Sequence, residues 1–477
     1  MGLQSSGSIS LSNIAGEFGG STPHSLSEYY DAASGIPASG QISFSNFYGA
    51  SAVSHWIATI GGTSIDDAAG IAVDGSGNVY IAGRTHSTGA GSYDALIVKY
   101  NADGVIQWQR TLGASGLDVG LGVAVDGSGN VYVHGYFFHA GAGTADFLTV
   151  KYNTSGTLQW QRALSSNTGK NEFGYGVGVD GSGNVYVCGQ TNARHSSYDM
   201  FIAKYYPSGH LVWQRSLGGS SSESAPNITV DNSGNFYVVG STQSAGVGKS
   251  DLYISKFNSA GTMQWQQCLG LSESDYGKGV GVDGSGNVYV SGYTRSTSGV
   301  QADALIAKYN ASGAIQWQRI LQSSSDVPDL SRDIAVDGSG NAYIVGNTRS
   351  SISGLTDVLI AKYNTSGTLQ WQRTLASSGV TNAIGYGVSV DNSGNIYVGG
   401  GGGTSGKCLI AKLPADGSMT GTYGSFTYAP SSLISSTASM YSRNPGSSVF
   451  ISAGLLTRST SSLTSSASNL TSSTTTL

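Results

Sequence analysis

The chain has 477 residues, which is more than one ordinary compact domain holds unless its architecture grows by repeated units. Charged residues make up only 11% of it, and its 71 glycines favour many short strands joined by tight turns. A formal net charge of -5 leaves no basic field for phosphate backbones, so we expect no nucleic-acid partner.

The N-terminus, the hydropathy and the cysteines indicate where the chain is made and whether it enters a membrane. The N-terminus, MGLQSSGSIS, has neither the basic start nor the apolar segment of a secretory signal. No stretch is long and apolar enough to span a bilayer, so we expect no membrane insertion. Cys188, Cys268 and Cys408 fall at strand-like positions of different repeats, which predicts buried free thiols and no disulfide.

Residues 1–50 are the first segment, and they contain three variants of one short phrase. The variants are SGSISLSNI, HSLSEYYD and SGQISFSNFYG. Ser25 and Glu28 have the spacing of a capping box, which predicts a brief helix in an otherwise small module. Fifty residues supply little core, so we expect this module to dock onto a larger partner.

Residues 51–414 contain seven copies of one unit. The phrase V-D-G-S-G-N-V-Y, or a close variant, recurs every 51 to 54 residues, and each copy has one tryptophan. The repeated aspartates are Asp74, Asp126, Asp180, Asp231, Asp283, Asp337 and Asp391. The tryptophans are Trp56, Trp108, Trp160, Trp213, Trp265, Trp317 and Trp371. A period near fifty residues is typical of propeller blades.

Each unit contains four short alternating runs, for example GVAVD, NVYVHGY, DFLTVKYN and LQWQRAL within residues 122–164. These runs predict four strands, A to D, with Asp-Gly-Ser-Gly-Asn as the A–B hairpin and Asn-Thr-Ser-Gly as the C–D hairpin. Such units bury both sheet faces only by stacking on neighbours, and ring closure leaves only short edges. The predicted fold is all-β, a seven-bladed β-propeller of four-stranded blades.

The tryptophan count predicts how the ring closes. Trp56 precedes the first aspartate turn, whereas the seventh unit has no tryptophan after its third strand. We therefore expect residues 54–60, with Trp56 and Ile57, to supply the outermost D strand of the last blade, beside residues 408–413. This strand would close the ring without a covalent bond and would cover two open edges.

The residues that recur in every unit are expected to be structural. The aspartate turns lack the string of acidic ligands of a calcium loop, so they predict hairpins without metal. The repeated tryptophan is expected to pack between blades. A lysine in the third strand and an aspartate at its start predict blade-to-blade ion pairs; the lysines are Lys99, Lys151, Lys204, Lys256, Lys308, Lys362 and Lys412.

No catalytic site is predicted. The seven histidines show no metal spacing, and none accompanies a nucleophile motif or a pair of carboxylates, so we expect neither enzymatic activity nor a cofactor. The alternative is an enzyme site in the central channel of the propeller.

Strand alternation places the A–B and C–D hairpins on one rim of the ring, the hairpin rim. The B–C and D–A connections lie on the other, the variable rim, where the loops differ from blade to blade. Aromatic and polar side chains on loops held by a rigid scaffold favour recognition, although loop irregularity alone is the alternative. The candidate recognition residues are Tyr136, Phe137, His139, Arg194, His195, Tyr293 and Arg295.

Residues 415–477 form a tail that is rich in serine and threonine. Leu456, Leu463, Leu470 and Leu477 are spaced by seven, as in the seam of a helix that packs on a partner. Serine and threonine are mediocre helix formers, so a disordered tail is the alternative.

The repeats resemble the seven-bladed β-propeller repeat family of bacterial and phage proteins, whose core phrase is G-[IV]-A-V-D-x-x-G-N-x-Y-[IV]-x-G. The phrases I-S-L-S-x-I-x-x-E-F-G-G, S-L-S-E-Y-Y and I-S-F-S-x-F-Y-G-A of residues 1–50 resemble an N-terminal module of virion structural proteins of tailed phages, many of them marine or cyanobacterial. Similar Leu-Thr-Ser tails occur in phage structural proteins.

These resemblances imply a structural protein of a tailed-phage virion, assembled in the host cytoplasm, in a tail fibre, baseplate, neck or capsid decoration. Residues 1–50 and 415–477 would attach to other virion proteins, and the propeller would serve assembly or recognise a host-surface glycan or protein. The alternatives are a bacterial surface or secreted adhesive propeller and a propeller lyase or glycosidase.

Overall fold

The computed structural model describes residues 10, 13–15, 55–89, 92–138, 143–166, 169–194, 196–295, 301–323, 327–349, 355–377, 382–402, 406–438, 440–443, 450–453, 457–459, 464–467 and 471–476. The chain divides into two compact units, Met1–His55 with Thr476–Leu477, and Trp56–Thr475. In the first unit, a helical turn covers residues 13–15, and the Asn13 amide donates to Ser10 Oγ at 3.2 Å. The helix predicted at Ser25 lies outside the described residues.

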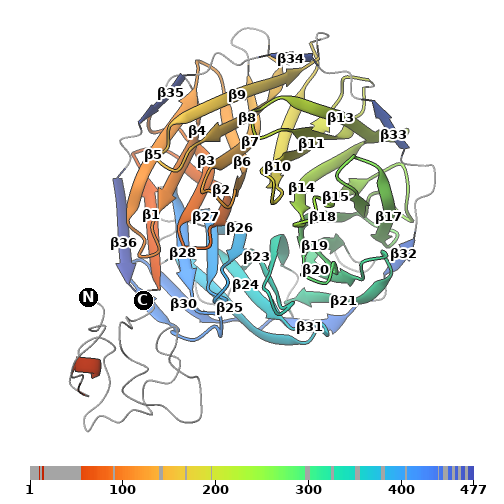
Figure 1. Ribbon diagram of the computed structural model, residues 1–477. Coiled ribbons are helices and arrows are strands. Elements are labelled where there is room, and N and C mark those ends of the chain that lie inside the picture. The colour runs from red at the N-terminus through yellow and green to blue at the C-terminus, as the bar shows by residue number, and fades with distance from the viewer. Residues whose placement is uncertain are drawn as a thin grey trace. The chain divides into compact units, whose positions relative to one another are not determined.

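The described part of the second unit forms seven antiparallel sheets arranged as the blades of a ring (Figure 1). The predicted seven-bladed propeller with four strands, A to D, in each blade is confirmed.

The A strands, nearest the ring centre, are β2 (Asp66–Val73), β6 (Asp118–Val125), β10 (Glu172–Val179), β14 (Glu223–Val230), β18 (Asp275–Val282), β22 (Leu330–Val336) and β26 (Ala383–Val390). The B strands are β3 (Val79–Thr85), β7 (Val131–Phe138), β11 (Val185–Thr191), β15 (Phe236–Thr242), β19 (Val288–Arg295), β23 (Ala342–Arg349) and β27 (Ile396–Gly402). The C strands are β4 (Asp94–Tyr100), β8 (Ala145–Tyr152), β12 (Asp199–Tyr205), β16 (Asp251–Phe257), β20 (Ala302–Tyr309), β24 (Thr356–Tyr363) and β28 (Lys407–Leu413). The D strands are β5 (Ile106–Gly113), β9 (Leu158–Ser165), β13 (Leu211–Gly218), β17 (Met263–Gly270), β21 (Ile315–Gln322), β25 (Leu369–Ser377) and, in the seventh blade, β1 (Trp56–Gly61). Blades are numbered 1 to 7 in this order.

The D strand of blade 7 closes the ring as predicted. Strand β1 pairs antiparallel with β28, with Trp56 opposite Lys412 and Ile57 opposite Ala411. The Trp56 indole stacks on Tyr100 of blade 1 at 5.8 Å, and its Nε1 donates to the Ala102 carbonyl at 3.1 Å. One buried side chain therefore joins the last blade to the first.

The tail differs from both expectations, because its described segments are strands. These segments add a further strand outside each D strand, so β1 is not the outermost strand of blade 7. A short strand, β29 (Gly421–Tyr423), precedes them and pairs with the first of them. The added strands, here called the belt, are β30 (Phe426–Pro430) on blade 6, β31 (Ile434–Thr437) on blade 5, β32 (Tyr441–Arg443) on blade 4, β33 (Phe450–Ala453) on blade 3, β34 (Thr457–Ser459) on blade 2, β35 (Thr464–Ala467) on blade 1 and β36 (Thr471–Thr476) on blade 7. Threonine suits strands, and each D strand offers an open edge, which explains the pairing.

The spacing of seven residues between the leucines equals the interval at which several belt strands follow one another along the chain. Strands β31 and β32 begin seven residues apart, as do β33, β34, β35 and β36 in succession. Leu433 and Met440, which precede β31 and β32, are 9% and 5% exposed and fill the cores between blades. Their carbonyls accept hydrogen bonds from Gln372 Nε2 at 2.7 Å and Gln318 Nε2 at 3.0 Å. The predicted seam leucines, Leu456, Leu463, Leu470 and Leu477, themselves lie outside the described residues.

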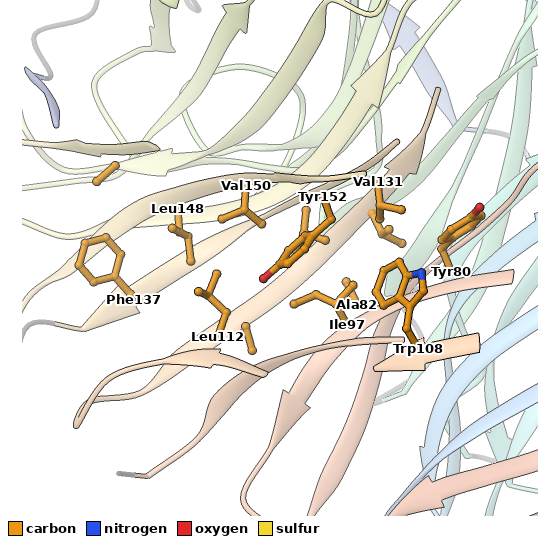
Figure 2. Close-up of a cluster of buried hydrophobic side chains, with 14 residues drawn as sticks. Tyr80, Ala82, Ile97, Trp108, Leu112, Val131, Phe137, Leu148, Val150 and Tyr152 are labelled. Atoms are coloured by element: carbon orange, nitrogen blue, oxygen red, sulfur yellow. The ribbon is translucent and has the colours of Figure 1, made fainter. Parts of the chain in front are cut away.

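The core lies between the facing sheets of neighbouring blades. Figure 2 shows one such layer, in which Tyr80 and Ile97 of blade 1 meet Leu148 and Tyr152 of blade 2. Trp108 stacks on Tyr152 at 6.2 Å, so the predicted place of the tryptophan between blades is confirmed. Burial of such layers is the main source of stability in a stacked-blade fold. The three cysteines are free and buried, as predicted.

The aspartate turn is a self-contained hairpin. Asp126 Oδ1 accepts the Ser128 and Asn130 amides at 2.9 Å each, and Oδ2 accepts Asn130 Nδ2 at 2.8 Å and the Tyr132 hydroxyl at 3.0 Å. Burial tends to raise the pKa of Asp126, but these hydrogen bonds outweigh it and the pKa is lowered. The carboxylate is thus engaged by its own turn, which explains why the phrase recurs in each blade.

The predicted girdle of ion pairs is wrong. Lys151 donates to the Pro207 carbonyl of the next blade at 3.5 Å, and its ammonium lies 5.1 Å from the Tyr132 ring centre. In blades 1 to 6 the aspartate lies near the start of the C strand and the lysine follows five residues later, as Asp146 and Lys151 do, which puts the two charges about 17 Å apart along an extended chain. The lysines therefore join blades through backbone carbonyls and aromatic faces.

Candidate binding site in the central channel

The A strands form the wall of the channel, and each carries a register irregularity near its fourth residue. Such bulges re-aim a side chain, and here they place one residue of each blade on the channel wall. The seven bulge residues are Ala69, Leu121, Tyr175, Pro226, Lys278, Arg332 and Tyr386. No two neighbouring blades present the same residue, whereas the hairpins on the other side are nearly identical.

These residues line a cavity of about 320 Å³, here called the channel cavity. Its wall also includes backbone of Gly70, Gly122 and Gly176. The volume is at the lower end of the roughly 300–1,000 Å³ that is usual for small-ligand sites.

A larger hollow of about 700 Å³ lies where blade 5 meets the belt, beside Trp317, Arg319 and Thr437. Its polar groups already serve the scaffold, since Trp317 Nε1 donates to the Thr365 carbonyl at 3.0 Å and Arg319 Nε donates to the Gly367 carbonyl at 2.8 Å. We therefore take the channel cavity as the candidate site.

Cations in and beside the channel cavity lie against tyrosine rings. The Lys278 ammonium is 6.0 Å from the Tyr276 ring centre and 5.7 Å from that of Tyr293. The Arg332 guanidinium lies 5.2 Å from the Tyr386 ring centre. Burial lowers the pKa of Lys278, and the nearby charge of Arg332 acts in the same direction.

Arg84 adds a third cation close to the cavity. It pairs with Asp67, with Nη2 and Oδ2 2.8 Å apart and Nε donating to the same oxygen at 3.0 Å. Its guanidinium also lies 4.8 Å from the Tyr93 ring centre. Arg84 thereby balances the charge of Asp67, and the cavity wall itself then sets two cations, Lys278 and Arg332, against the single carboxyl group of Asp333.

A hydrogen bond joins two blades that are not neighbours. Asn227 Nδ2 of blade 4 donates to Asp333 Oδ1 of blade 6 at 2.9 Å, and the Val388 amide of blade 7 donates to Asp333 Oδ2 at 3.0 Å. Blade 5 has Gly279 at the same strand position, where an added Cβ would lie 2.6 Å from the Ile334 nitrogen. Burial raises the pKa of Asp333 to about 7, although its hydrogen bonds act in the opposite direction.

Two of the predicted recognition residues lie near the cavity. Tyr293 contacts Lys278, as described above. Tyr136 is half-buried and packs edge-on against Phe173 at 5.1 Å, and the charge of Arg84 acts on its hydroxyl. Both side chains belong to B-strand ends on the variable rim, which brings them beside the starts of the A strands.

The other predicted residues are not gathered there. Phe137 is 6% exposed and belongs to the core between blades 1 and 2, because strand alternation turns it away from Tyr136; it is therefore no part of a recognition surface. Arg194 is half-buried and Arg295 is exposed. His139 and His195 lie outside the described residues.

The wall residues are not among those singled out from the sequence, because a position that varies within a repeated strand is less conspicuous than a variable loop. These residues are Tyr175, Lys278, Arg332, Asp333 and Tyr386. The signal was nevertheless present. Aligning the A strands on their shared V-D ending shows one position, four residues before the valine, that changes from blade to blade within a repeated phrase.

Two searches of the described residues bear on other site types. They contain no group of three or more His, Cys, Asp or Glu side chains placed to hold a metal ion. No helix among them has the length and apolar character needed to cross a membrane.

Comparison with known proteins supports the fold. Residues 55–89, 163–194, 264–298 and 329–352 match the family described as "Beta-propeller repeat", and residues 75–106 match a beta-propeller domain of unknown function. The chain is 23% identical, over 61% of its length, to an uncharacterized WD repeat-containing protein of Acanthamoeba polyphaga mimivirus, and it spans only 30% of that protein.

Two solved structures are similar to this chain at low identity. The β-propeller domain of the trilobed protease from Pyrococcus furiosus is 10% identical, with a TM-score of 0.41, over 73% of this chain and 94% of that one. A gluconolactonase from Xanthomonas campestris is 13% identical, with a TM-score of 0.32, over 60% of this chain and 90% of that one.

Proposed function

We propose that this protein is a structural component of a tailed-phage virion that displays a rigid β-propeller for host-surface recognition without catalysing a reaction. The observation that supports display best is the contrast between a uniform hairpin rim and a channel wall on which neighbouring blades present different side chains. A ring that served only as a spacer would need no such set. Recognition residues on a rigid scaffold bind with little loss of conformational entropy.

The assignment to a virion rests on residues 1–50, whose phrases resemble an attachment module of phage structural proteins. The mimivirus relative is also a viral protein, though it is uncharacterized. We assign attachment to other virion proteins mainly to residues 1–50. The described strands of residues 415–477 pair with the D strands of this chain's own blades along one of their backbone edges.

The belt fits a protein displayed outside the cell. Each D strand has a partner outside it, so the edges of the D strands are covered around the described ring, and mostly shorter strands become the outer edges of the sheets. A protein that meets varied salt concentrations and temperatures outside the cell benefits from D strands that are covered in this way.

Mass spectrometry and cryo-electron microscopy of purified particles of the virus that encodes this chain test the proposal. We expect the full-length chain in the particle and density for a seven-bladed ring. A chain that lacks residues 1–50 should fold but should be missing from particles. Particles without the full-length chain would refute the virion assignment.

A propeller lyase or glycosidase is the second candidate, because Asp333, with a pKa of about 7, shares the channel cavity with Lys278 and Tyr386. Two hydrogen bonds already hold the Asp333 carboxylate, which favours a structural role. Incubating the protein with acidic oligosaccharides and following the products by mass spectrometry separates the two. If the protein cleaves an oligosaccharide and Asp333→Asn abolishes that cleavage, the protein is an enzyme and the non-catalytic proposal fails.

A further inference from the structure

We propose that the channel cavity binds the end group of an acidic saccharide, a sugar that carries a carboxylate or a sulfate. This deepens the proposed recognition role by naming the ligand class. The binding can be tested on the isolated full-length chain, so its failure is distinguishable from failure of the virion assignment.

The charge of the cavity selects an anion. The Lys278 ammonium lies near the rings of Tyr276 and Tyr293, Lys278 forms no ion pair among the described residues, and the charge of Arg332 acts on it. A desolvated ammonium without a carboxylate partner is costly to keep charged. A bound anionic group would supply that missing partner, and the adjacent guanidinium would share it.

Arg332 is held in an orientation that suits this role. Its Nε donates to Asn347 Oδ1 at 2.9 Å, and its guanidinium carbon lies 5.2 Å from the centre of the Tyr386 ring. The side chain is therefore positioned before any ligand arrives, which lowers the entropy cost of binding. Guanidinium groups bind carboxylate and sulfate oxygens through paired donors.

The aromatic side chains favour a sugar over a bare inorganic ion. Tyr175 and Tyr386 are both half-buried on the wall, and Leu121 adds an apolar face. Tyrosine combines an apolar ring face with a polar hydroxyl, so it packs against the C–H face of a sugar ring and hydrogen-bonds to its hydroxyls. A small anion such as phosphate would leave these surfaces unused.

The place of the cavity favours a chain end. The Asn227–Asp333 hydrogen bond spans from blade 4 to blade 6 within the cavity wall. Arg84, Tyr276 and Tyr293 lie toward the variable rim, at the ends of B strands and the start of an A strand. A ligand therefore enters from the variable rim, and a volume of about 320 Å³ accepts a terminal group but not a long polymer.

The experiment measures binding to the full-length protein by calorimetry and by ligand-observed NMR. The probes are a glucuronate-terminated disaccharide, a sulfated disaccharide, and the neutral glucose disaccharide of the same linkage. We expect an acidic probe to bind at least tenfold more tightly than the neutral one. Preference for the carboxylate or the sulfate probe identifies which anion the cavity accepts, and either preference supports the proposal.

Lys278→Met tests the central cation, and it should weaken binding of the acidic probe at least tenfold. Lys249→Met is the matched control, because Lys249 is exposed near the same rim and pairs with Glu273 at 2.7 Å outside the cavity. The control should bind as the unmodified protein does. Equal losses in both variants would indicate general attraction to a charged surface and would overturn the proposal.

Leu121→Trp gives a second test that leaves each cation in place. The larger side chain should fill the cavity from the wall of blade 2 and abolish binding, while thermal melting confirms an intact ring. No binding of either acidic probe by the unmodified protein, or full binding by Leu121→Trp, would overturn the proposal.

Discussion

The hairpin rim and the channel wall are built from the same repeated unit but differ in how they use it. At the hairpin rim, the Asp126, Asn130 and Tyr132 network recurs from blade to blade with nearly the same distances. At the channel wall, the same strand position carries Lys278 in one blade and Arg332 in the next. Residues that recur in every blade are those that each blade needs to fold. A position that differs between neighbouring blades is free to carry a side chain for a function of the whole ring.

The largest loss of stability is expected when the ring cannot close, because the hairpin rim and the channel wall both depend on a closed ring. Deleting residues 1–60 removes most of β1 and opens the edge of β28, whereas deleting residues 1–50 leaves the strand in place. We expect the longer deletion to lower the melting temperature by more than about 10 °C or to cause aggregation. Similar melting of both truncated chains would contradict a closing role for β1.

A pair of single substitutions tests the comparison directly. Asp126→Ala removes a carboxylate that accepts four hydrogen bonds and should lower the free energy of unfolding by about 2–4 kcal/mol. It should not change binding of the acidic probe. Lys278→Met should weaken binding of the acidic probe but keep the free energy of unfolding within about 1 kcal/mol of that of the unmodified protein. Denaturant unfolding measures the stability of both variants, and calorimetry measures their binding of the acidic probe. A variant that loses both stability and binding would contradict the separation of the two regions.

The belt is expected to belong with the scaffold. Leu433→Ala should cost about 2–3 kcal/mol, because the side chain is 9% exposed between blades 5 and 6. Ile434→Ala, at the adjacent and 52% exposed position, should cost less than about 0.5 kcal/mol. Equal costs in chemical denaturation would mean that the seven-residue step does not anchor the belt.

Two buried carboxyl groups, one in the channel cavity and one at a D–A loop, should make the stability of the ring depend on pH. Burial raises the pKa of Asp333 and of Glu172 to about 7 each, above the unfolded values of about 4. The folded chain therefore holds protons that the unfolded chain releases, so the free energy of unfolding should fall between about pH 4 and pH 7. We expect Asp333→Asn and Glu172→Gln each to flatten this fall by about 1–2 kcal/mol in denaturant titrations at pH 5 and pH 8.

Ligand binding should distinguish those two variants. Asp333 shares the channel cavity with Lys278, Arg332 and Tyr386, with Arg84 and Asp67 nearby, whereas Glu172 caps a D–A loop through the Ser166 amide. Protonating Asp333 below about pH 7 makes the cavity more positive, so binding of the acidic probe should strengthen there. Asp333→Asn should remove that pH dependence and Glu172→Gln should keep it. The opposite pattern would place the titrating group outside the cavity.

The smallest effect is expected from chelation. The aspartate turns use their carboxylate oxygens within the hairpin, so EDTA should leave the melting temperature unchanged. A drop of several degrees that calcium reverses would show that these turns hold ions in solution.

Much of the fold could be predicted because its signals are local and repeated. The seven aspartate turns and the alternating runs marked the hairpins and strands, and the place of Trp56 marked the offset that closes the ring. The belt could not be predicted, because leucines spaced by seven suit a helix seam as well as a strand that steps between blades. Of the residues expected at a recognition rim, Tyr136 and Tyr293 lie beside the cavity, whereas Phe137 is buried in the core.

The sequence by itself determined the number of blades, their strand order and the chemistry of each turn, because a hairpin depends on residues a few positions apart. Only the tertiary structure decided which side chains meet in the channel. Asn227 and Asp333 are 106 residues apart, and Lys278 and Arg332 lie in separate blades, so they become neighbours only when the ring is complete. The belt also depends on the finished ring, since its strands need open D-strand edges before they have anything to pair with.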